Sequence, residues 1–242
     1  MAETAPDIDA VPSLSPHSGM FAIASLFAIV GGFLDAYSYL ARGHVFANAQ
    51  TGNVVLFGVR AAAGNWASAG RTLPPIFAYM CGVVVARLLR VRIEKRTFRA
   101  TLICQALQLL VLFVLLFFGR FVPDFCAVPL IAFTSALQNI SFSNVGPWQF
   151  NSTQTTANLR NAVSGWVQLA LGEKDPNLWG KAIVGSVISL CFATGALLGG
   201  VCTLGLPAFP LLPAVVLTAA GTLLTIRERQ RRLTSKGDRT VY

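Results

Sequence analysis

Apolar windows about as long as a bilayer is thick recur along this chain of 242 residues and constrain its fold more than any other feature. A helix needs about 20 apolar residues to cross a hydrocarbon core of roughly 30 Å. With 54% hydrophobic and only 12% charged residues, the composition is that of a membrane protein. We therefore expect an all-α, polytopic protein with about six transmembrane helices. The windows occupy residues 20–41, 73–90, 98–118, 125–146, 179–202 and 205–226.

Basic residues gather at two places, between the second and third windows and after the last one. Because positively charged loops stay on the cytoplasmic side, both clusters and the N-terminus are expected there. Spans three to six supply the even number of crossings that this requires. The net charge of +9 is thus a topology signal, and no nucleic-acid partner is expected. The clusters comprise Arg87, Arg90, Arg92, Lys95, Arg96 and Arg99, and Arg227, Arg229, Arg231, Arg232, Lys236 and Arg239.

The same pattern divides the chain into three parts. Residues 1–19 are rich in Pro and Ser and predict a disordered cytoplasmic tail. Residues 20–226 form a single transmembrane domain, with repeat one at about 20–118 and repeat two at about 125–226. Residues 227–242 are a basic cytoplasmic tail.

The division into two repeats rests on two stretches that look like edited copies of one another. The first runs from Gly32 to Tyr39 and is followed by Thr51-Gly52-Asn53. The second runs from Ser135 to Phe142 and is followed by Thr156-Ala157-Asn158. Both place polar residues inside or beside an apolar window, which predicts two structural halves that meet at a polar site. The aligned pairs are Leu34 with Leu137, Asp35 with Gln138, Ser38 with Ser141, Thr51 with Thr156, and Asn53 with Asn158.

The segments 47–63 and 151–171 decide the architecture, because they have helical length but are too polar to face lipid throughout. We expect each to be an amphipathic helix that lies at the interface or enters the membrane part-way as a re-entrant element. Each half then crosses three times, and an odd number inverts the second half relative to the first. Inverted repeats are a recurring plan of secondary transporters, with substrate sites near the midplane.

A small-xxx-small spacing recurs in the second crossing of each half. Gly82 and Ala86 match Gly195 and Gly199. Small residues at this spacing let two membrane helices approach closely, so both segments are expected to be helix contacts.

The run Gly32-x-x-Asp35-Ala-x-Ser-Tyr39, with Gly43-x-Val45-Phe46 and Thr51-Gly52-Asn53, resembles the signature of the YoaK-like bacterial membrane proteins, a domain-of-unknown-function family. Leu137-Gln138-Asn139 is similar to its second-half counterpart. The resemblance extends from about 20 to 226. It implies about six membrane helices and a bacterial inner membrane, and it supplies no substrate.

Asp35 is the first candidate for a functional residue, since it is the one acid inside an expected span. Exposure of a charged group near mid-membrane costs about 3 kcal/mol on insertion scales, so this side chain should face the bundle interior. Three roles remain open: a proton or cation site, a partner for a basic substrate, or a structural acceptor in a local network with Ser38 and Tyr39.

The other candidates also have two interpretations. Thr51, Asn53, Thr156 and Asn158 either cap the amphipathic helices or present helix amino ends to an anionic group. Gln138 and Asn139 form hydrogen bonds either between helices or with a ligand. The expected substrate site comprises Asp35, Ser38, Tyr39, Thr51, Asn53, Gln138, Asn139, Thr156 and Asn158.

The leading functional hypothesis is a small secondary transporter or permease that takes an unknown small molecule or ion. Six helices make a thin wall around a pathway, which favours a homodimer. The alternative is a non-transporting scaffold or sensor whose basic tail binds anionic lipid or a partner. No nucleophile–base pair or metal-ligand spacing is visible in the sequence, so neither an enzyme, a cofactor nor a metal is expected.

Overall fold

The computed structural model describes residues 18–92, 97–141, 144–145, 148–149, 155–206 and 208–237. Nearly all of these residues are helical, which confirms the all-α class. The exception is a pair of two-residue antiparallel strands, β1 (Asn144–Val145) and β2 (Trp148–Gln149). The expected disordered tail falls largely on residues 1–17, outside the described residues.

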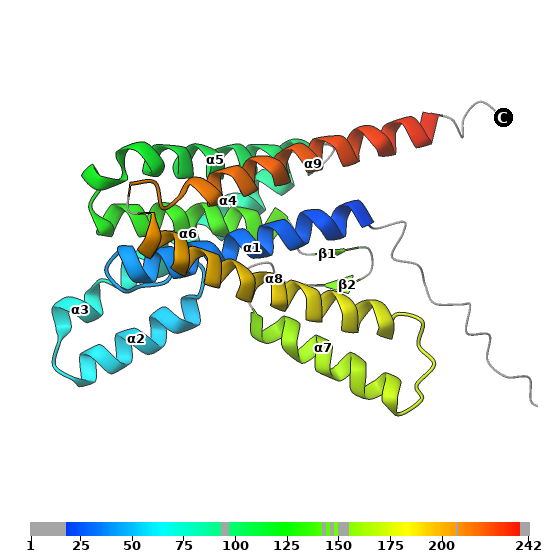
Figure 1. Ribbon diagram of the computed structural model, residues 1–242, viewed down its shortest axis with the longest axis horizontal. Helices are drawn as coiled ribbons and strands as arrows, with labels where there is room; N and C mark the ends of the chain where they lie inside the picture. The colour runs from blue at the N-terminus through cyan, green and yellow to red at the C-terminus, as the bar shows by residue number, and fades with distance from the viewer. Residues whose placement is uncertain are drawn as a thin grey trace, which may run out of the picture.

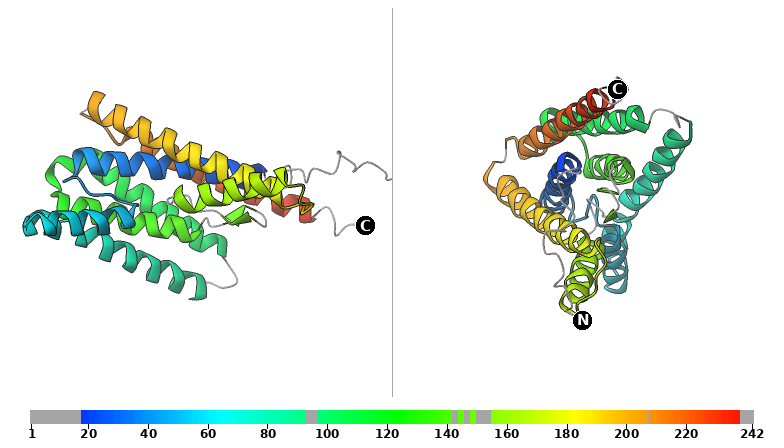
Figure 2. Two further views of the ribbon diagram at one scale, coloured as in Figure 1. Left: turned by 90° about the horizontal axis from the view of Figure 1, so that it is seen from below. Right: turned by 90° about the vertical axis from the view of Figure 1, so that its right-hand side faces the viewer.

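Six long helices overlap with the six apolar windows and lie roughly along the long axis of the molecule (Figure 1). Seen end-on, α1 and α6 lie at the centre and the other long helices surround them (Figure 2). The bounds are α1 (Ser18–Ala41), α4 (Leu73–Arg92), α5 (Thr97–Phe118), α6 (Asp124–Ser141), α8 (Leu178–Gly205) and α9 (Leu212–Gly237).

Four segments of the described chain are long and apolar enough to cross a membrane: Gly19–Ala41, Trp66–Leu89, Phe98–Phe121 and Leu178–Gly205. Four of the six expected spans therefore have the length and composition of a full membrane crossing, and the other two do not. The reason is that α6 ends at Ser141 rather than near 146, which leaves a shorter apolar helix. Similarly, α9 begins at Leu212 rather than 205, and its apolar part ends where Arg227 begins the basic run. It then continues as a helix through Gly237.

Short helices follow the first long helix of each half. They are α2 (Gln50–Ala62) and α7 (Thr155–Ala170), within the expected segments 47–63 and 151–171. At 1.5 Å per residue they measure about 20 and 24 Å, too short for a hydrocarbon core of roughly 30 Å. Two smaller elements, α3 (Trp66–Gly70) and η3 (Gly119–Phe121), lie in connections. Figure 1 shows α2 and α7 running from the middle of the molecule toward opposite ends.

Glycine contacts confirm the predicted close approach of the long helices. A Cβ on Gly199 of α8 would lie 2.5 Å from the carbonyl oxygen of Phe33 in α1, and a Cβ on Gly195 would lie even closer to the carbonyl oxygen of Ile29. In the other half, a Cβ on Gly82 of α4 would lie 2.5 Å from the carbonyl oxygen of Phe133 in α6. Each small-xxx-small segment therefore packs against the first long helix of the opposite half.

The largest apolar core lies where α1, α5, α6 and α9 meet, toward the end of the molecule where α1 ends. Phe33 and Leu34 of α1 pack there with Leu112 of α5 and Ile131 of α6, and all four side chains are fully buried. This core fixes the position of the last turns of α1. The chain that follows α1 is therefore built on a rigid support.

Candidate functional site

Asp35 and Ser38 hold the loop that connects α1 to α2. Oδ1 of Asp35 accepts hydrogen bonds from the backbone N–H of Asn48 at 2.6 Å and of Ala49 at 3.4 Å. Oγ of Ser38 accepts one from the N–H of Ala47 at 3.0 Å. The three backbone N–H groups lie in a loop and make no hydrogen bonds within a helix, and an unpaired N–H is costly in the low-dielectric interior. The two side chains supply the acceptors. The loop is thereby fixed against the last turns of α1.

Asn53 holds the same loop from the side of α2. Its Oδ1 accepts the backbone N–H of Phe46 at 2.8 Å, and its Nδ2 donates to the carbonyl oxygen of Phe46 at 2.8 Å. The interpretation of Thr51 and Asn53 as caps is wrong, because α2 begins at Gln50 and its N-cap is Ala49, which makes no side-chain cap bond. The asparagine instead ties the loop to the first turn of the helix. For α7, the capping position 154 lies outside the described residues.

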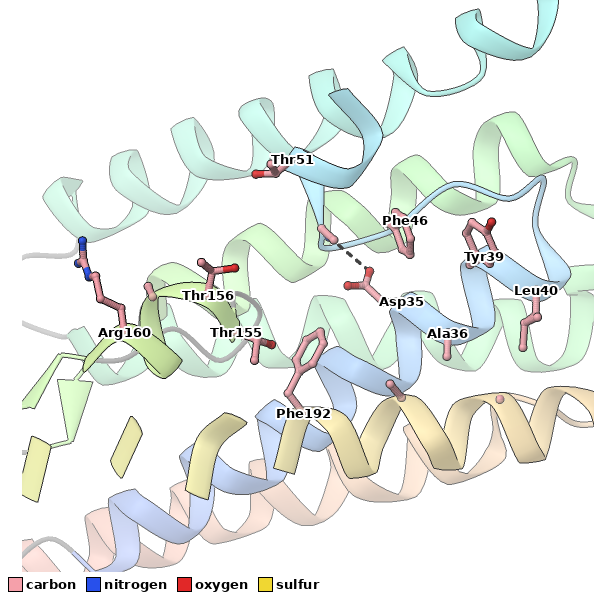
Figure 3. Close-up of a pocket in the computed structure, with 14 residues that line it drawn as sticks. Asp35, Ala36, Tyr39, Leu40, Phe46, Thr51, Thr155, Thr156, Arg160 and Phe192 are labelled. Carbon is pink, nitrogen blue, oxygen red and sulfur yellow. Dashed lines mark hydrogen bonds between the residues drawn. The ribbon is translucent and has the colours of Figure 1, made fainter. Parts of the chain in front are cut away.

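A cavity of about 730 Å³ lies beside this loop (Figure 3). Its first wall comes from α1, the loop and the start of α2, and its second wall comes from the start of α7 and the middle of α8. Segments far apart in the chain thus enclose one space. The lining residues are Asp35, Ala36, Tyr39, Leu40, Phe46, Ala49 and Thr51, and Thr155, Thr156, Ala157, Arg160, Phe192, Ala196 and Gly200.

The amino ends of α2 and α7 both reach this cavity, which is the main geometric feature of the site. Thr51 lies in the first turn of α2, and Thr155 and Thr156 lie in the first turn of α7. The hydroxyls of Thr155 and Thr156 point to the side of the cavity where Asp35 lies (Figure 3). The Thr155 hydroxyl oxygen is buried and has no hydrogen-bond partner. The two amino ends add partial positive charge to the lining.

Four of the residues predicted for a substrate site line this cavity together: Asp35, Tyr39, Thr51 and Thr156. Asp35 is 5% exposed, whereas Thr51 and Thr156 are exposed. The other predicted residues do not line it. Ser38 and Asn53 are fully buried in the loop network, and Asn158 is buried beside α8, where its carbonyl oxygen lies against Gly185.

Gln138 and Asn139 lie in helix contacts away from the cavity. Oε1 of Gln138 accepts a hydrogen bond from Nε2 of Gln108 at 2.6 Å, and its Nε2 donates to the carbonyl oxygen of Phe27 at 3.2 Å. Nδ2 of Asn139 donates to the hydroxyl of Tyr79 at 2.8 Å. The interhelical interpretation of these two amides is therefore confirmed, and a ligand contact at either one stays a prediction.

Sequence reasoning did not identify Thr155, Arg160, Phe46 and Phe192 as lining residues. Thr155 and Arg160 lie in the first two turns of α7, close to Thr156. The Thr156-Ala157-Asn158 motif could therefore have indicated them. No sequence pattern indicated Phe192, because an aromatic ring in an apolar span is an ordinary core residue.

Arg42 was also missed, and it links the end of α1 to the connection between α5 and α6. Its Nε donates to the Tyr37 hydroxyl at 2.8 Å, and Nη2 donates to the carbonyl oxygen of Gly119 at 2.9 Å. Nη1 contacts the carbonyl oxygen of Val122 at 3.2 Å and Oδ1 of Asp124 at 3.3 Å. Burial lowers the pKa of the guanidinium, but the bonds to Tyr37 and Asp124 outweigh burial and raise it overall. Arg42 therefore stays charged.

These features define a polytopic helical membrane protein with a cavity that is lined by α1 and α2 from the first part of the chain and by α7 and α8 from the second. The chain belongs to the family described as "Protein of unknown function (DUF1275)", whose model matches residues 23–224. It is also similar to the UPF0700 transmembrane protein YoaK of Bacillus subtilis (strain 168), with 28% identity over 141 residues. That match covers 57% of this chain and 63% of the relative, which is less than two thirds of its length. The YoaK-like resemblance is thus confirmed. No solved structure matches the chain.

Proposed function

We propose that this chain is a small secondary transporter or permease of the bacterial inner membrane, built from two three-helix inverted repeats that share one substrate site. The observation that carries the proposal is the meeting of α2 and α7 at their amino ends. These helices occupy corresponding positions in the two halves, and both line the cavity beside Asp35. Interrupted helices that meet at a site between inverted halves are a recurring feature of secondary transporters.

The helix packing supports the inverted arrangement. α1 packs on α8 and α4 packs on α6, so the first long helix of each half contacts the second long helix of the other. The third helices repeat this exchange, with α1 on α9 and α6 on α5. In Figure 1 the corresponding helices of the two halves run in opposite directions along the long axis. A two-fold exchange of inverted halves accounts for all of these relations.

The basic residues support a cytoplasmic location for one end of the bundle. Arg87 and Arg99 flank the connection between α4 and α5, and Arg227 and Arg229 lie near the end of α9. The guanidinium carbon of Arg229 lies 4.1 Å from the ring centroid of Phe98, so the two clusters share one end. By the positive-inside rule this end, with the start of α1, faces the cytoplasm. The end that contains Arg42 then faces outward.

A transporter must expose its site to each side in turn, and the Arg42 network is well placed to close the outer side. It connects the end of α1 to Gly119, Val122 and Asp124, at the junction where the first half passes to the second. A rocking motion between the halves would break these bonds and open the cavity outward. Closure on the other side would then require the start of α7 to move toward α1.

Cysteine labelling tests this proposal. We would replace the five native cysteines and introduce Thr51→Cys or Thr156→Cys at the cavity. A membrane-impermeant thiol reagent would then be applied to right-side-out and to inside-out vesicles. We expect both cavity cysteines to react from both sides. The matched control is Val163→Cys on α7, whose side chain is 60% exposed on the apolar face, and it should react from neither side.

A cross-linking experiment distinguishes a transporter with alternating access from an open channel. A Cβ on Gly43 would lie 3.9 Å from Cβ of Asp124, which suits a disulfide between Gly43→Cys and Asp124→Cys. Because Gly43 has a φ of 75°, a cysteine there costs about 1 kcal/mol. The disulfide should abolish labelling from the outside, preserve it from the inside, and release on reduction. Cavity cysteines that react from one side only, in every state, would contradict the transporter proposal.

A second candidate function, a membrane scaffold or sensor, is favoured by the basic end of α9. This helix extends beyond its packing partner α5, and Arg227, Arg229 and Arg231 are exposed along it (Figure 1). Such a helix fits an anionic lipid surface or an acidic partner. In that case, deletion of residues 227–242 should abolish the cellular phenotype while Asp35→Asn leaves it intact. The transporter proposal expects Asp35→Asn to abolish the phenotype.

A further inference from the structure

The inner part of the cavity contains one formal charge, the carboxylate of Asp35. Among the described residues, no lysine, arginine or histidine forms an ion pair with it; the salt bridge of this region joins Arg42 to Asp124. Arg160 also lines the cavity, but its side chain is exposed and its guanidinium points away from Asp35 (Figure 3). The carboxylate is therefore stabilised by backbone N–H groups and lacks a cationic partner.

The negative charge of Asp35 favours a positively charged ligand. A charge removed from water is costly unless an opposite charge or good hydrogen bonds replace the solvent. A cation in the cavity would pair with Asp35 in a region of low dielectric, where the attraction is stronger than in water. An anion drawn to the amino ends of α2 and α7 would lie in the same cavity as the carboxylate and be repelled by it.

The aromatic rings select an organic cation over a metal ion. Tyr39, Phe46 and Phe192 line the cavity, and the rings of Tyr39 and Phe46 stack with centroids 5.0 Å apart. The faces of aromatic rings attract ammonium groups. The buried hydroxyl oxygen of Thr155, which has no partner, adds an acceptor for an ammonium N–H. Metal ions prefer several oxygen ligands, and most of this wall is carbon.

We propose that the cavity binds an amine as its ammonium ion, with the charged head at Asp35 and an apolar body against the rings of Tyr39, Phe46 and Phe192. This inference rests on the proposed function, since it names the substrate class of the same site. The cavity volume of about 730 Å³ accommodates a small organic molecule. The remaining lining, which includes Ala36, Leu40 and Ala196, contacts the apolar body.

Equilibrium binding to the purified full chain in detergent tests the ligand class. The probes are 2-phenylethylamine, its anionic analogue 3-phenylpropionate and its neutral analogue 3-phenylpropanol, which have similar shapes and differ in charge. Titration calorimetry and the thermal unfolding midpoint are measured for each. We expect saturable binding and a raised midpoint with the amine alone. Preference for the carboxylate, equal binding of the alcohol, or no binding of the amine would overturn the inference.

Two variants and a control locate the binding. Asp35→Asn keeps an oxygen that accepts the N–H of Asn48 but removes the charge, and amine affinity should fall at least about tenfold. If that variant does not fold, Phe192→Leu keeps an apolar wall and should weaken the amine about fivefold, with little effect on the alcohol. Asp124→Asn removes a carboxylate outside the cavity and should bind the amine normally. Unchanged affinity in both cavity variants would overturn the assignment.

The binding test and the labelling test distinguish a failure of the ligand assignment from a failure of the transporter proposal. Amine binding that depends on Asp35, in a protein whose cavity cysteines react from one side only, retains the ligand class and rejects transport. Two-sided labelling without amine binding retains transport and rejects the ligand class.

Discussion

Oδ1 of Asp35 accepts the backbone N–H of Asn48 at 2.6 Å, and this contact joins the interior of a membrane span to the residue before the N-cap of α2. The carboxylate is 5% exposed and lines the cavity at the same time. One side chain therefore positions the amino end of a short helix and presents charge to the space that the helix faces. Substitutions at Asp35 should separate these two roles.

Replacement of Asp35 by leucine should destabilise the fold more than replacement by asparagine. Leucine leaves the buried N–H of Asn48 without an acceptor, which costs about 1–3 kcal/mol. Asparagine keeps an oxygen at that position and should lose less. The measurement is the free energy of unfolding in detergent for both variants. Equal losses would show that the carboxylate does not support the loop.

Replacement of Arg42 by methionine should lower stability by about 2–3 kcal/mol, because it removes hydrogen bonds to Tyr37 and to the carbonyl oxygens of Gly119 and Val122. Asp124→Asn is the comparison. Its side chain is 50% exposed, so loss of that ion pair should cost about 0–1 kcal/mol. If the unfolding midpoint fell equally in both variants, the stabilising effect of Arg42 would come from its ion pair with Asp124 alone.

Gly195→Ala should separate α8 from α1, because a Cβ there collides with the backbone of Ile29. We expect loss of the monodisperse folded protein in size-exclusion chromatography, or a drop in unfolding free energy of about 3 kcal/mol or more. Gly58→Ala in α2 is a matched control, since a Cβ at Gly58 meets no atom within 4 Å. That change should be neutral or stabilise the helix by about 0.5–1 kcal/mol. A larger loss of stability in Gly58→Ala than in Gly195→Ala would contradict the described packing.

Gln108 and Gln138 should show coupled effects on stability. Loss of either side chain removes the hydrogen bond that joins the two amides, whereas Gln108→Leu combined with Gln138→Leu removes both polar groups. A double-mutant cycle should give a coupling energy of about 0.6–1.7 kcal/mol, the range found for hydrogen bonds between membrane helices. Additive losses would mean that the 2.6 Å contact contributes no net stability.

The sequence was sufficient for the class of fold and for the presence of a short helix within each of the segments 47–63 and 151–171, because both depend on local hydrophobicity. The repeated motif also predicted a shared site for Asp35, Thr51 and Thr156, and these three residues line one cavity. For Gln138 and Asn139 the sequence left open a choice between interhelical hydrogen bonds and a ligand contact, and both amides form hydrogen bonds between helices. Adjacent helical positions face different neighbours, and the sequence alone does not say which helices those are.

Arg42 was missed for a related reason. Three of its four acceptors lie 77–82 residues away, on Gly119, Val122 and Asp124, and the fourth is the hydroxyl of Tyr37. Two of the distant acceptors are backbone carbonyl oxygens. Carbonyl groups occur at every residue and leave no pattern in a sequence. The prediction of six full spans failed where α6 ends early, at Ser141, and where α9 begins late, at Leu212.

The orientation of α2 and α7 is the central claim, and reporter fusions after residues 65 and 173 test it most directly. Residue 65 follows α2 and residue 173 follows α7. An alkaline phosphatase reporter is active outside the cytoplasm, and a fluorescent reporter is active inside. The inverted arrangement predicts that residue 65 lies outside and residue 173 lies in the cytoplasm. Both reporters on the same side would contradict the inverted halves and the site that they share.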